Sequence, residues 1–281
     1  MSPNLYVTID TLKGGGAFNL EGTAYESRLL SLTNGVSRQI DRWCNRHFYY
    51  LIETRTFSGY GGTRLLVSDL ISLSSVKEDT NVDGTFETTW ATADYLLAPF
   101  NANPTAEWGR AYSWIDVNES SNGTQDEWLK GQRNYELAGT WGYWKVTRDT
   151  GENGTGTLTS TGTVLTLTAS STLELGQMIV LDSEIMFING RSGTDGTAFT
   201  VERAINGSTA TAHPTADVFT IIFPQPVTEA CFIQAGRLWK RKDSAFMNLV
   251  GIGEIGQLTV SKMGLDQDVK DLLMPYRKLA V

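Results

Sequence analysis

The sequence predicts an α+β protein: a helical core with a β-rich layer, plus a small all-β module that is a barrel or a sandwich. Three observations predict it. An apolar stripe with helical spacing runs through residues 23–46, short strand-like runs fill residues 48–144, and residues 147–223 are dominated by Thr and Gly. Helical periodicity returns after residue 225. We therefore expect helices at both ends of the chain and strands between them.

The first long helix is predicted in TAYESRLLSLTNGVSRQIDRWCNR, residues 23–46. Its large apolar residues recur every three or four positions, which places them on one face of a helix. They are Leu29, Leu32, Val36, Ile40 and Trp43. The other face carries Ser, Arg, Gln and Asp. The pattern is that of a helix with one face turned to the core.

Residues 48–144 are predicted to form a β-rich layer. Short runs of strand-forming residues are separated by Gly, Asn and Pro. The runs are ETRTFSGYGG, RLLVSDLISL, TFETTW, DYLLAPF and YELAGTWGYW. Trp141 and Trp144 in the last run suit either a sugar-binding platform or packing in a core or interface. Packing is favoured because it requires no ligand.

Residues 147–224 are predicted to form a separate all-β module. Its strand-like segments are TVLTLTA, GQMIVLD, EIMFI, AFTVERAI and DVFTIIF. In the fourth, Phe199 and Val201 alternate with Thr200 and Glu202, the period of a half-buried strand. Five or six such strands must hide one face and cover their edges, so we expect a small antiparallel barrel or sandwich.

A second long helix is predicted in PVTEACFIQAGRLWKRKDS, where Pro226 suits the first turn. Its apolar face carries Val227, Cys231, Gln234 or Ala235, and Leu238. Four cations gather in the last turns: Arg237, Lys240, Arg241 and Lys242. Cations there oppose the negative end of the helix dipole, so we interpret them as helix-end electrostatics rather than a DNA site.

Two further segments follow this helix. NLVGIGEIGQ is rich in glycine and is expected to be a loop. DQDVKDLLMPYRK is expected to be a short helix that Pro275 ends, because proline cannot continue the hydrogen-bond ladder.

The composition excludes several classes of protein. A net charge of −8 argues against nonspecific binding to nucleic acid, which depends on Lys and Arg. Cys44 and Cys231 lie in apolar, helix-like patterns and are expected to be buried free thiols in a reducing compartment. MSPNLYVTID lacks the features of a signal peptide, and no stretch approaches the roughly 18 apolar residues of a membrane span. We expect a protein that is made in the cytoplasm and contacts no membrane.

One stretch, DTNVDGTFETTW, has the spacing of a calcium loop. Asp79, Asn81, Asp83 and Gly84 match the opening of an EF-hand. The twelfth loop position requires a bidentate carboxylate but is Trp90, and the flanks are strand-like. We interpret Asp83-Gly84 as a hairpin turn in which Asp79 and Asn81 cap backbone amides. Weak calcium binding near Asp79, Asn81 and Asp83 is kept as an alternative.

The sequence carries no catalytic signature. It has no GxSxG, phosphate loop, HExxH or Cys-x-x-Cys motif. Its two histidines, His47 and His213, lie in different predicted domains with no nearby second metal ligand. We therefore predict no catalytic, cofactor-binding or metal-binding residues, no cofactor and no enzymatic activity.

Several segments, taken in order, resemble the head-tail connector (adaptor) proteins of tailed bacteriophages. These segments are RQID, RHF, TRTFSGYGG, LLVSDLISLSSVKEDTNVDGTFETTWATADYLLAP, AGTWGYW, PVTEACFIQAGRLWKRKDS and GLDQDVKDLLMPYRK. Each match is short, and the resemblance lies in their shared order. It covers about residues 1–145 and 225–281.

The chain departs from this family pattern at one place. In the family, the strand ending in Trp-Gly-Tyr runs almost directly into the Pro-led helix, whereas here roughly 80 residues intervene. An inserted domain is the simplest account, with connector core in residues 1–146 and 225–281 and the insertion in residues 147–224. Within it, EIMFINGRSGTDGTAFTVERAINGSTATAH is similar to small β modules of phage structural proteins.

The resemblance implies a virion structural protein of the phage neck, made in the bacterial host cytoplasm. Its partners would be further copies of itself in a dodecameric ring, the portal protein, and the tail or stopper protein. The inserted module would contact capsid, tail or neck fibres. In genome packaging and ejection, DNA would pass through the ring without specific binding, which suits the acidic chain.

The resemblance also implies which residues meet partners. The portal-facing candidates in the final segment are Leu272, Leu273, Tyr276, Arg277 and Leu279. Docking of this segment on the protein's own helices is an equal alternative. Independently of the resemblance, Trp108 and Trp114, near Pro104 and Arg110, are expected to be exposed and are the candidates for the interface between subunits.

Two other functions are kept as alternatives. The first is a phage neck or tail protein whose β module binds a host-surface glycan. The second is an enzyme, which no residue spacing in the chain supports.

Overall fold

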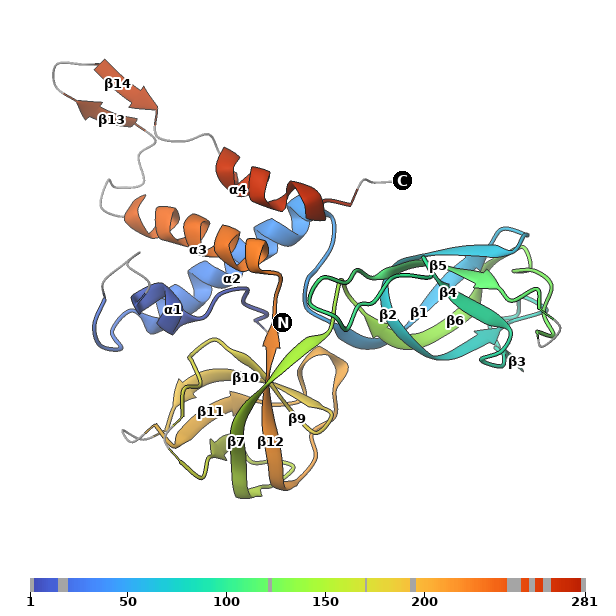
Figure 1. The fold of residues 1–281 in the computed structure, drawn as a ribbon, viewed down its shortest axis with the longest axis horizontal. Coiled ribbons are helices and arrows are strands. Elements are labelled where there is room, and N and C mark those ends of the chain that lie inside the picture. Colours follow the sequence, from blue (N-terminus) through green and yellow to red (C-terminus); the bar gives the residue numbers. More distant parts are fainter. Residues whose placement is uncertain are drawn as a thin grey trace. The chain divides into compact units, whose positions relative to one another are not determined.

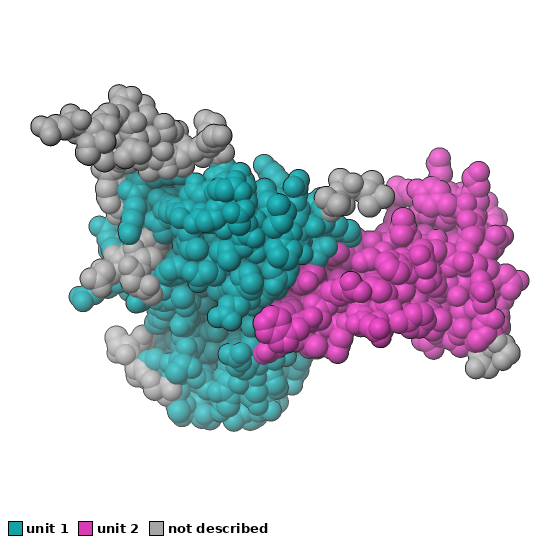
Figure 2. All heavy atoms as spheres, turned by 45° about the horizontal axis from the view of Figure 1, so that its top comes forward, with its two compact units in different colours: residues 1–46, 147–281 teal, residues 47–146 magenta. Residues whose placement is uncertain are grey.

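The computed structural model describes residues 3–14, 20–120, 123–169, 171–192, 196–241, 249–252, 256–259 and 264–278 (Figure 1). Within these ranges the chain forms four α-helices and two six-stranded antiparallel sheets, which confirms the α+β class. Its contacts define two compact units. Unit 1 comprises residues 1–46 and 147–281, and unit 2 comprises residues 47–146 (Figure 2).

The helices of unit 1 come from both ends of the sequence. They are α1 (Ile9–Gly14), α2 (Glu26–Cys44), α3 (Gln225–Lys240) and α4 (Gln267–Leu273), which a 3-10 turn (Met274–Tyr276) extends. α2 lies beside α3 in Figure 1, and Ser37 Oγ is 3.6 Å from Cys231 Sγ although these residues are 194 positions apart. Both long helices lie where the sequence predicts them.

The predicted apolar face of α2 is buried at Leu29, Val36 and Ile40, and half-buried at the other two predicted positions. Thr33 and Ser37 share this buried face. Their hydroxyls donate to the carbonyls of the residues four positions earlier, at 2.7 and 2.9 Å. Small polar residues can therefore be buried here, because each satisfies its hydroxyl within the helix.

The buried face of α3 carries Val227, Cys231, Gln234 and Ala235, as predicted, whereas Leu238, also predicted there, is half-buried. Cys44 and Cys231 are both buried free thiols, which also confirms the prediction. Burial raises the pKa of each thiol to about 12. Neither thiol is therefore a reactive thiolate at neutral pH.

The cations at the end of α3 hold α4. Arg237 donates to Asp266 at 3.1 Å and to Asp268 at 2.5 Å, and Arg241 lies 3.7 Å from Asp266. Asp266 is the N-cap residue of α4, where a carboxylate is favoured by the helix dipole. These arginines therefore act in helix-end electrostatics within unit 1. Lys242 lies outside the described residues.

The prediction of a loop in NLVGIGEIGQ is wrong. β13 (Leu249–Ile252) and β14 (Gly256–Thr259) pair antiparallel and form a two-stranded sheet of their own. Glycines weaken a strand but do not exclude it where β-branched residues such as Val250 and Ile252 lie between them.

Residues 146–222 form a six-stranded barrel in unit 1. Its strands are β7 (Val146–Leu158), β8 (Val164–Thr166), β9 (Met178–Leu181), β10 (Glu184–Arg191), β11 (Ala198–Glu202) and β12 (His213–Ile222). They pair in the order β7-β12-β9-β10-β11-β8, and an isolated bridge between Gly154 of β7 and Leu167, next to β8, links the two ends. This bridge brings the two edge strands of the sheet together, so the sheet is here called the barrel.

A buried ionic network joins the loops at one end of this barrel. Glu184 accepts two bonds from Arg203, both 2.6 Å long. Arg203 also donates to the carbonyls of Thr159, Gly162 and Thr211. The side chains of Glu184 and Arg203 therefore link their own two segments to residues 159–162 and to Thr211.

His213 belongs to the same network. Its Nε2 lies 2.9 Å from Glu184 and its Nδ1 lies 2.7 Å from Asp182. The sequence analysis expected no second metal ligand near this histidine, whereas the β9–β10 turn brings two carboxylates to it. The Glu184 oxygens are already engaged by Arg203, so the group is an ionic network rather than an open metal site.

The N-terminal segment docks on the barrel through polar contacts. The side-chain amides of Asn4 and Asn206 exchange two hydrogen bonds, of 3.0 and 2.8 Å. The Ile9 amide donates to the Leu175 carbonyl at 2.8 Å, and the Leu175 amide donates to Asp10 at 2.7 Å. These paired bonds fix the barrel to the helices within unit 1.

Unit 2 contains the other six-stranded sheet. Its strands are β1 (Leu51–Gly59), β2 (Arg64–Glu78), β3 (Thr88–Thr89), β4 (Tyr95–Ala98), β5 (Tyr112–Val117) and β6 (Gly131–Trp141). The order is β1-β6-β2-β5-β4, and β3 pairs with β2. β2 pairs with β5 over its first half and with β6 over its second. The sequence analysis missed β5.

Aromatic side chains fill the core of unit 2. Trp90 stacks on Trp128 at 4.3 Å between ring centres, and Trp141 and Trp144 are both buried. Packing of Trp141 and Trp144 is thus confirmed, and neither ring is available as a sugar platform. Glu78 is buried in unit 2 and accepts from Trp90 Nε1 at 2.9 Å and from Tyr135 at 2.8 Å.

The barrel network predicts a pH-dependent stability. Burial alone would raise the pKa of Glu184, but bonds from Arg203, His213 and two backbone amides lower it from 4.5 to about 2. The stabilisation that ionised Glu184 gives to the folded state is therefore complete above pH ~4.5. It is lost as the pH falls from there toward 2. Glu184→Gln should cost about 3–5 kcal/mol at neutral pH, because it leaves Arg203 buried without its counter-ion.

Urea unfolding of the full chain, followed through barrel-specific amide exchange, measures this cost. The difference between wild type and Glu184→Gln should shrink as the pH is lowered. Asp217→Asn, on exposed β12 surface, is the matched control and should change stability by less than ~0.5 kcal/mol. A pH-independent difference would contradict the assignment.

Candidate functional site

The described part of unit 2 carries a groove at the start of β6. One hollow of about 470 Å³ is lined by residues 58–60 and 130–133. A second, of about 380 Å³, is lined by Gln132 and Arg133 together with residues from the β2–β3 loop. The two hollows are neighbours, because Gln132 and Arg133 line both, and together they are here called the β6 groove.

Close backbone packing shapes this groove. A Cβ atom at Gly59 would lie 2.0 Å from the Leu129 carbonyl oxygen, so only glycine fits there. The Gly59 amide donates to Asn134 Oδ1 at 2.9 Å, and Asn134 Nδ2 donates to the Leu129 carbonyl at 3.0 Å. Arg133 has a φ of 53°, and its amide donates to Ser58 at 3.0 Å. The backbone that carries Lys130 and Arg133 is therefore fixed by hydrogen bonds.

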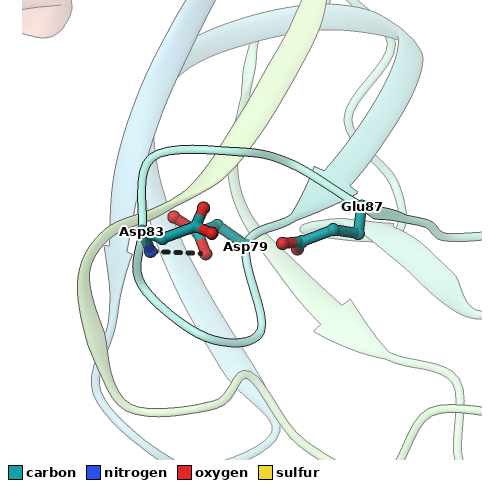
Figure 3. A group of neighbouring side chains, drawn as sticks. All are labelled: Asp79, Asp83 and Glu87. Carbon is teal, nitrogen blue, oxygen red and sulfur yellow. Dashed lines mark hydrogen bonds between the residues drawn. The ribbon is translucent and has the colours of Figure 1, made fainter.

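Three carboxylates gather at one side of the groove. Asp79, Asp83 and Glu87 each contribute an oxygen, and these oxygens lie within 4.8 Å of one another (Figure 3). Asp79 is buried and the other two are exposed. Within the described ranges this is the one group of at least three His, Cys, Asp or Glu side chains that could surround a metal ion. The sequence analysis identified Asp79 and Asp83 but missed Glu87.

Backbone amides already occupy the buried carboxylate. Asp79 accepts from the amide of Asp83 at 3.2 Å (Figure 3). It also accepts from the amide of Gly84 at 2.7 Å. Asn81 also accepts from the Asp83 amide, at 3.0 Å. The prediction that Asp79 and Asn81 cap local amides is confirmed. The bond from the Thr85 amide lowers the pKa of Asp83, so this carboxylate is ionised at neutral pH.

This geometry differs from that of an EF-hand. The loop joins β2 to β3 rather than two helices, and Trp90, at the twelfth position, is buried against Trp128. Calcium requires six to eight oxygen ligands, and two of the oxygens in this cluster serve backbone amides. The arrangement can attract a cation electrostatically, while its loop is held by its own hydrogen bonds.

The two candidate subunit-interface residues lie in different surroundings. Trp108, in the β4–β5 loop, is 93% exposed. Trp114, on β5, is half-buried and lies opposite Leu66 of β2. The guanidinium of Arg64 lies 4.7 Å from the Trp114 ring centre, and Trp114 Nε1 donates to Asp116 at 3.0 Å. Trp108 is thus the more available of the two for contact with a partner.

The candidate portal-facing residues also differ in availability. Leu273 is fully buried in unit 1, whereas Leu272 and Tyr276 are half-buried and Arg277 is exposed. Arg277 lies 5.3 Å from the ring centre of Trp43 on α2. The amide of Lys278 donates to the Cys44 carbonyl at 2.8 Å, at the end of the same helix. The segment therefore docks on α2, as the alternative interpretation expects, and Leu279 lies outside the described residues.

Comparison with protein-family models gives no match, and comparison with curated proteins gives no significant match. Among the residues that the structure describes, no helix is both long enough and apolar enough to cross a membrane.

Asp79→Asn tests whether amide bonds or an ion hold the acidic loop. An amide side chain offers one accepting oxygen instead of two, so one of the bonds from Asp83 or Gly84 is lost. We expect a loss of about 1–2 kcal/mol in the free energy of unfolding, with or without calcium. Urea denaturation in calcium and in chelator measures it.

Glu87→Gln is the matched control. Glu87 accepts one long bond, of 3.3 Å from the Thr80 amide, and is exposed. Its replacement should change stability by less than about 0.5 kcal/mol. Calcium that stabilises the wild type but neither variant would show instead that the three carboxylates bind the ion.

Proposed function

We propose that this chain is a virion structural protein, the head-tail adaptor of a tailed bacteriophage. Many copies form a ring that joins the portal to the tail or stopper. In this proposal the helices are the connector core and the barrel is an inserted domain. The same copies engage portal and tail together, so modest single contacts add through avidity.

The observation that carries the proposal is the contact between the two ends of the chain. α2 and α3 pack together across 194 residues of sequence, and Arg237 and Arg241 attach α4 to α3. The segments that resemble connector proteins at both chain ends thus meet in one helical body. An uninterrupted ancestor with an insertion between them accounts for this arrangement.

The proposed bounds of the connector core differ from those predicted from the sequence. The sequence-based division joins residues 1–146 and 225–281 in one core, whereas the contacts group residues 1–46 with 147–281. We propose that the core consists of the helices alone. Residues 47–146 and the barrel are then two β excursions from it, each with its own apolar core.

Two features support assembly with other chains. The β13–β14 hairpin joins neither six-stranded sheet among the described strands, and an isolated hairpin is marginally stable in water. Trp108 is almost fully exposed, and tryptophan is enriched where interfaces bury their central contacts. Both features suit a protein that completes its packing in a ring.

The docking of the C-terminal segment on α2 leaves fewer of the candidate residues able to contact the portal. Leu273 serves the protein's own core, so its predicted partner role is left to its neighbours Leu272, Tyr276 and Arg277.

The net charge of −8 suits a ring through which DNA slides without adhering. In this proposal the barrel is the part that contacts the capsid.

The glycan alternative rests on less. It places the sugar on the barrel, residues 147–224, and no described residue there has been identified as a sugar platform. The two tryptophans that could have formed such a platform, Trp141 and Trp144, lie outside the barrel and are buried. A glycan array probed with the whole protein would revive it by a reproducible hit that is lost when the barrel is removed.

Electron microscopy of the purified protein mixed with portal rings tests the proposal. We expect a closed ring capping one face of the portal. Leu272→Ser should leave the chain folded and weaken portal binding about tenfold or more, because loss of an interface anchor repeats in every copy. Gln267→Ala, in the first turn of the same helix, is the control and should bind normally. Portals that stay uncapped at every protein concentration would contradict the proposal.

A further inference from the structure

Trp108 is the most exposed large apolar side chain among the described residues. Within those residues its ring contacts no other ring, and its indole nitrogen has no hydrogen-bond partner. A tryptophan offers a large apolar face and one donor, and it gains most when a pocket covers the face. Trp108 would therefore be stabilised by a surface that buries its ring.

The loop that carries Trp108 is fixed by its own backbone. The amide of Gly109 donates to the Ala106 carbonyl at 2.9 Å, and the Ala106 amide donates to the Asn103 carbonyl at 3.1 Å. A Cβ atom at Gly109 would lie 1.5 Å from the Asn103 oxygen, so the turn admits only glycine there. A side chain held on a rigid loop loses little entropy on binding.

The β6 groove has the chemistry to receive an indole ring. Tyr60 at its rim is 82% exposed and can stack on another aromatic ring. Lys130 and Arg133 line the same hollow, and neither has a carboxylate partner among the described residues. Cations are attracted to the face of tryptophan more than to that of other aromatic residues. The hollow, at about 470 Å³, is large enough for one indole.

The groove and Trp108 lie at opposite ends of unit 2. The groove residues Lys130 and Arg133 flank the first residue of β6. The last residue of β6, Trp141, pairs with Leu70, which also pairs with Tyr112 at the start of β5. Trp108 precedes Tyr112 by one short turn. The length of β6 is about 30 Å, so the two features cannot meet within one chain.

We propose that Trp108 of one copy inserts into the β6 groove of a second copy. Glu107, the exposed neighbour of Trp108, then brings a carboxylate toward Lys130 and Arg133, which complements their charge. The contact is heterologous because it joins two different surfaces of the same chain. Heterologous contacts close into a ring when the rotation between copies permits it. The inference rests on the proposed ring and names the surfaces that hold it together.

Site-specific photo-cross-linking tests the contact. The full chain carries p-benzoylphenylalanine in place of Trp108 and is irradiated both alone, up to millimolar concentration, and on portal rings. Mass spectrometry then identifies the attached peptide. We expect cross-links between chains to residues 58–60 or 130–133. Cross-links confined to other peptides, or none between chains, would overturn the inference.

A double-mutant cycle supplies the second measurement. Trp108→Ala and Tyr60→Ala should each weaken self-association about tenfold, and the double variant should be little weaker than either single one, because both remove the same contact. Val164→Ala removes an exposed apolar side chain from the barrel and should leave association unchanged. Fully additive losses would overturn the pairing.

The two proposals fail separately. A capping ring that forms equally well with Trp108→Ala would overturn this contact and leave the adaptor function intact. Cross-linking into the groove without any capping of portals would support the contact and contradict the adaptor function.

Discussion

The packing of α2 against α3 is the constraint on which the rest of the structure depends. The buried face of α2 is apolar except at Thr33 and Ser37, whose hydroxyls are satisfied within the helix. Ser37 also accepts from the Tyr6 amide at 3.2 Å, which draws the N-terminal segment onto the same body. Residues between the two helices must therefore leave this body and return to it. Such excursions cost little, because doubling a loop adds only about 0.6 kcal/mol of closure entropy.

Each β body has a buried polar group that fixes its loops. In the barrel, Glu184 and Arg203 join segments that are far apart in sequence. In unit 2, Glu78 joins Trp90 to Tyr135, and burial together with this carboxylate raises the pKa of Tyr135. Buried polar groups are costly unless satisfied, so these networks favour one arrangement of the strands over others. Rigid loops in turn allow exposed side chains such as Trp108 to be presented in a fixed position.

The sequence predicted what depends on local periodicity. The helices at 26–44 and 225–240, the buried thiols, and the amide-capped turn at Asp79 follow from spacings of a few residues. It missed β5 and β7, because Tyr112–Val117 lies beyond a Pro- and Gly-containing loop and β7 is rich in Thr and Gly. It also missed Glu87 in the acidic cluster and the Glu184–Arg203–His213 network. Those groups form only when strand pairing brings distant residues together, which no local pattern reports.

Native-state hydrogen exchange, resolved by segment along the full chain, tests the central claim most directly. If the two chain ends form one body, the amides of α2 and α3 will open together with a single free energy of unfolding, distinct from that of the unit 2 strands. Exchange in which α2 opens with unit 2 while α3 opens independently would contradict the account.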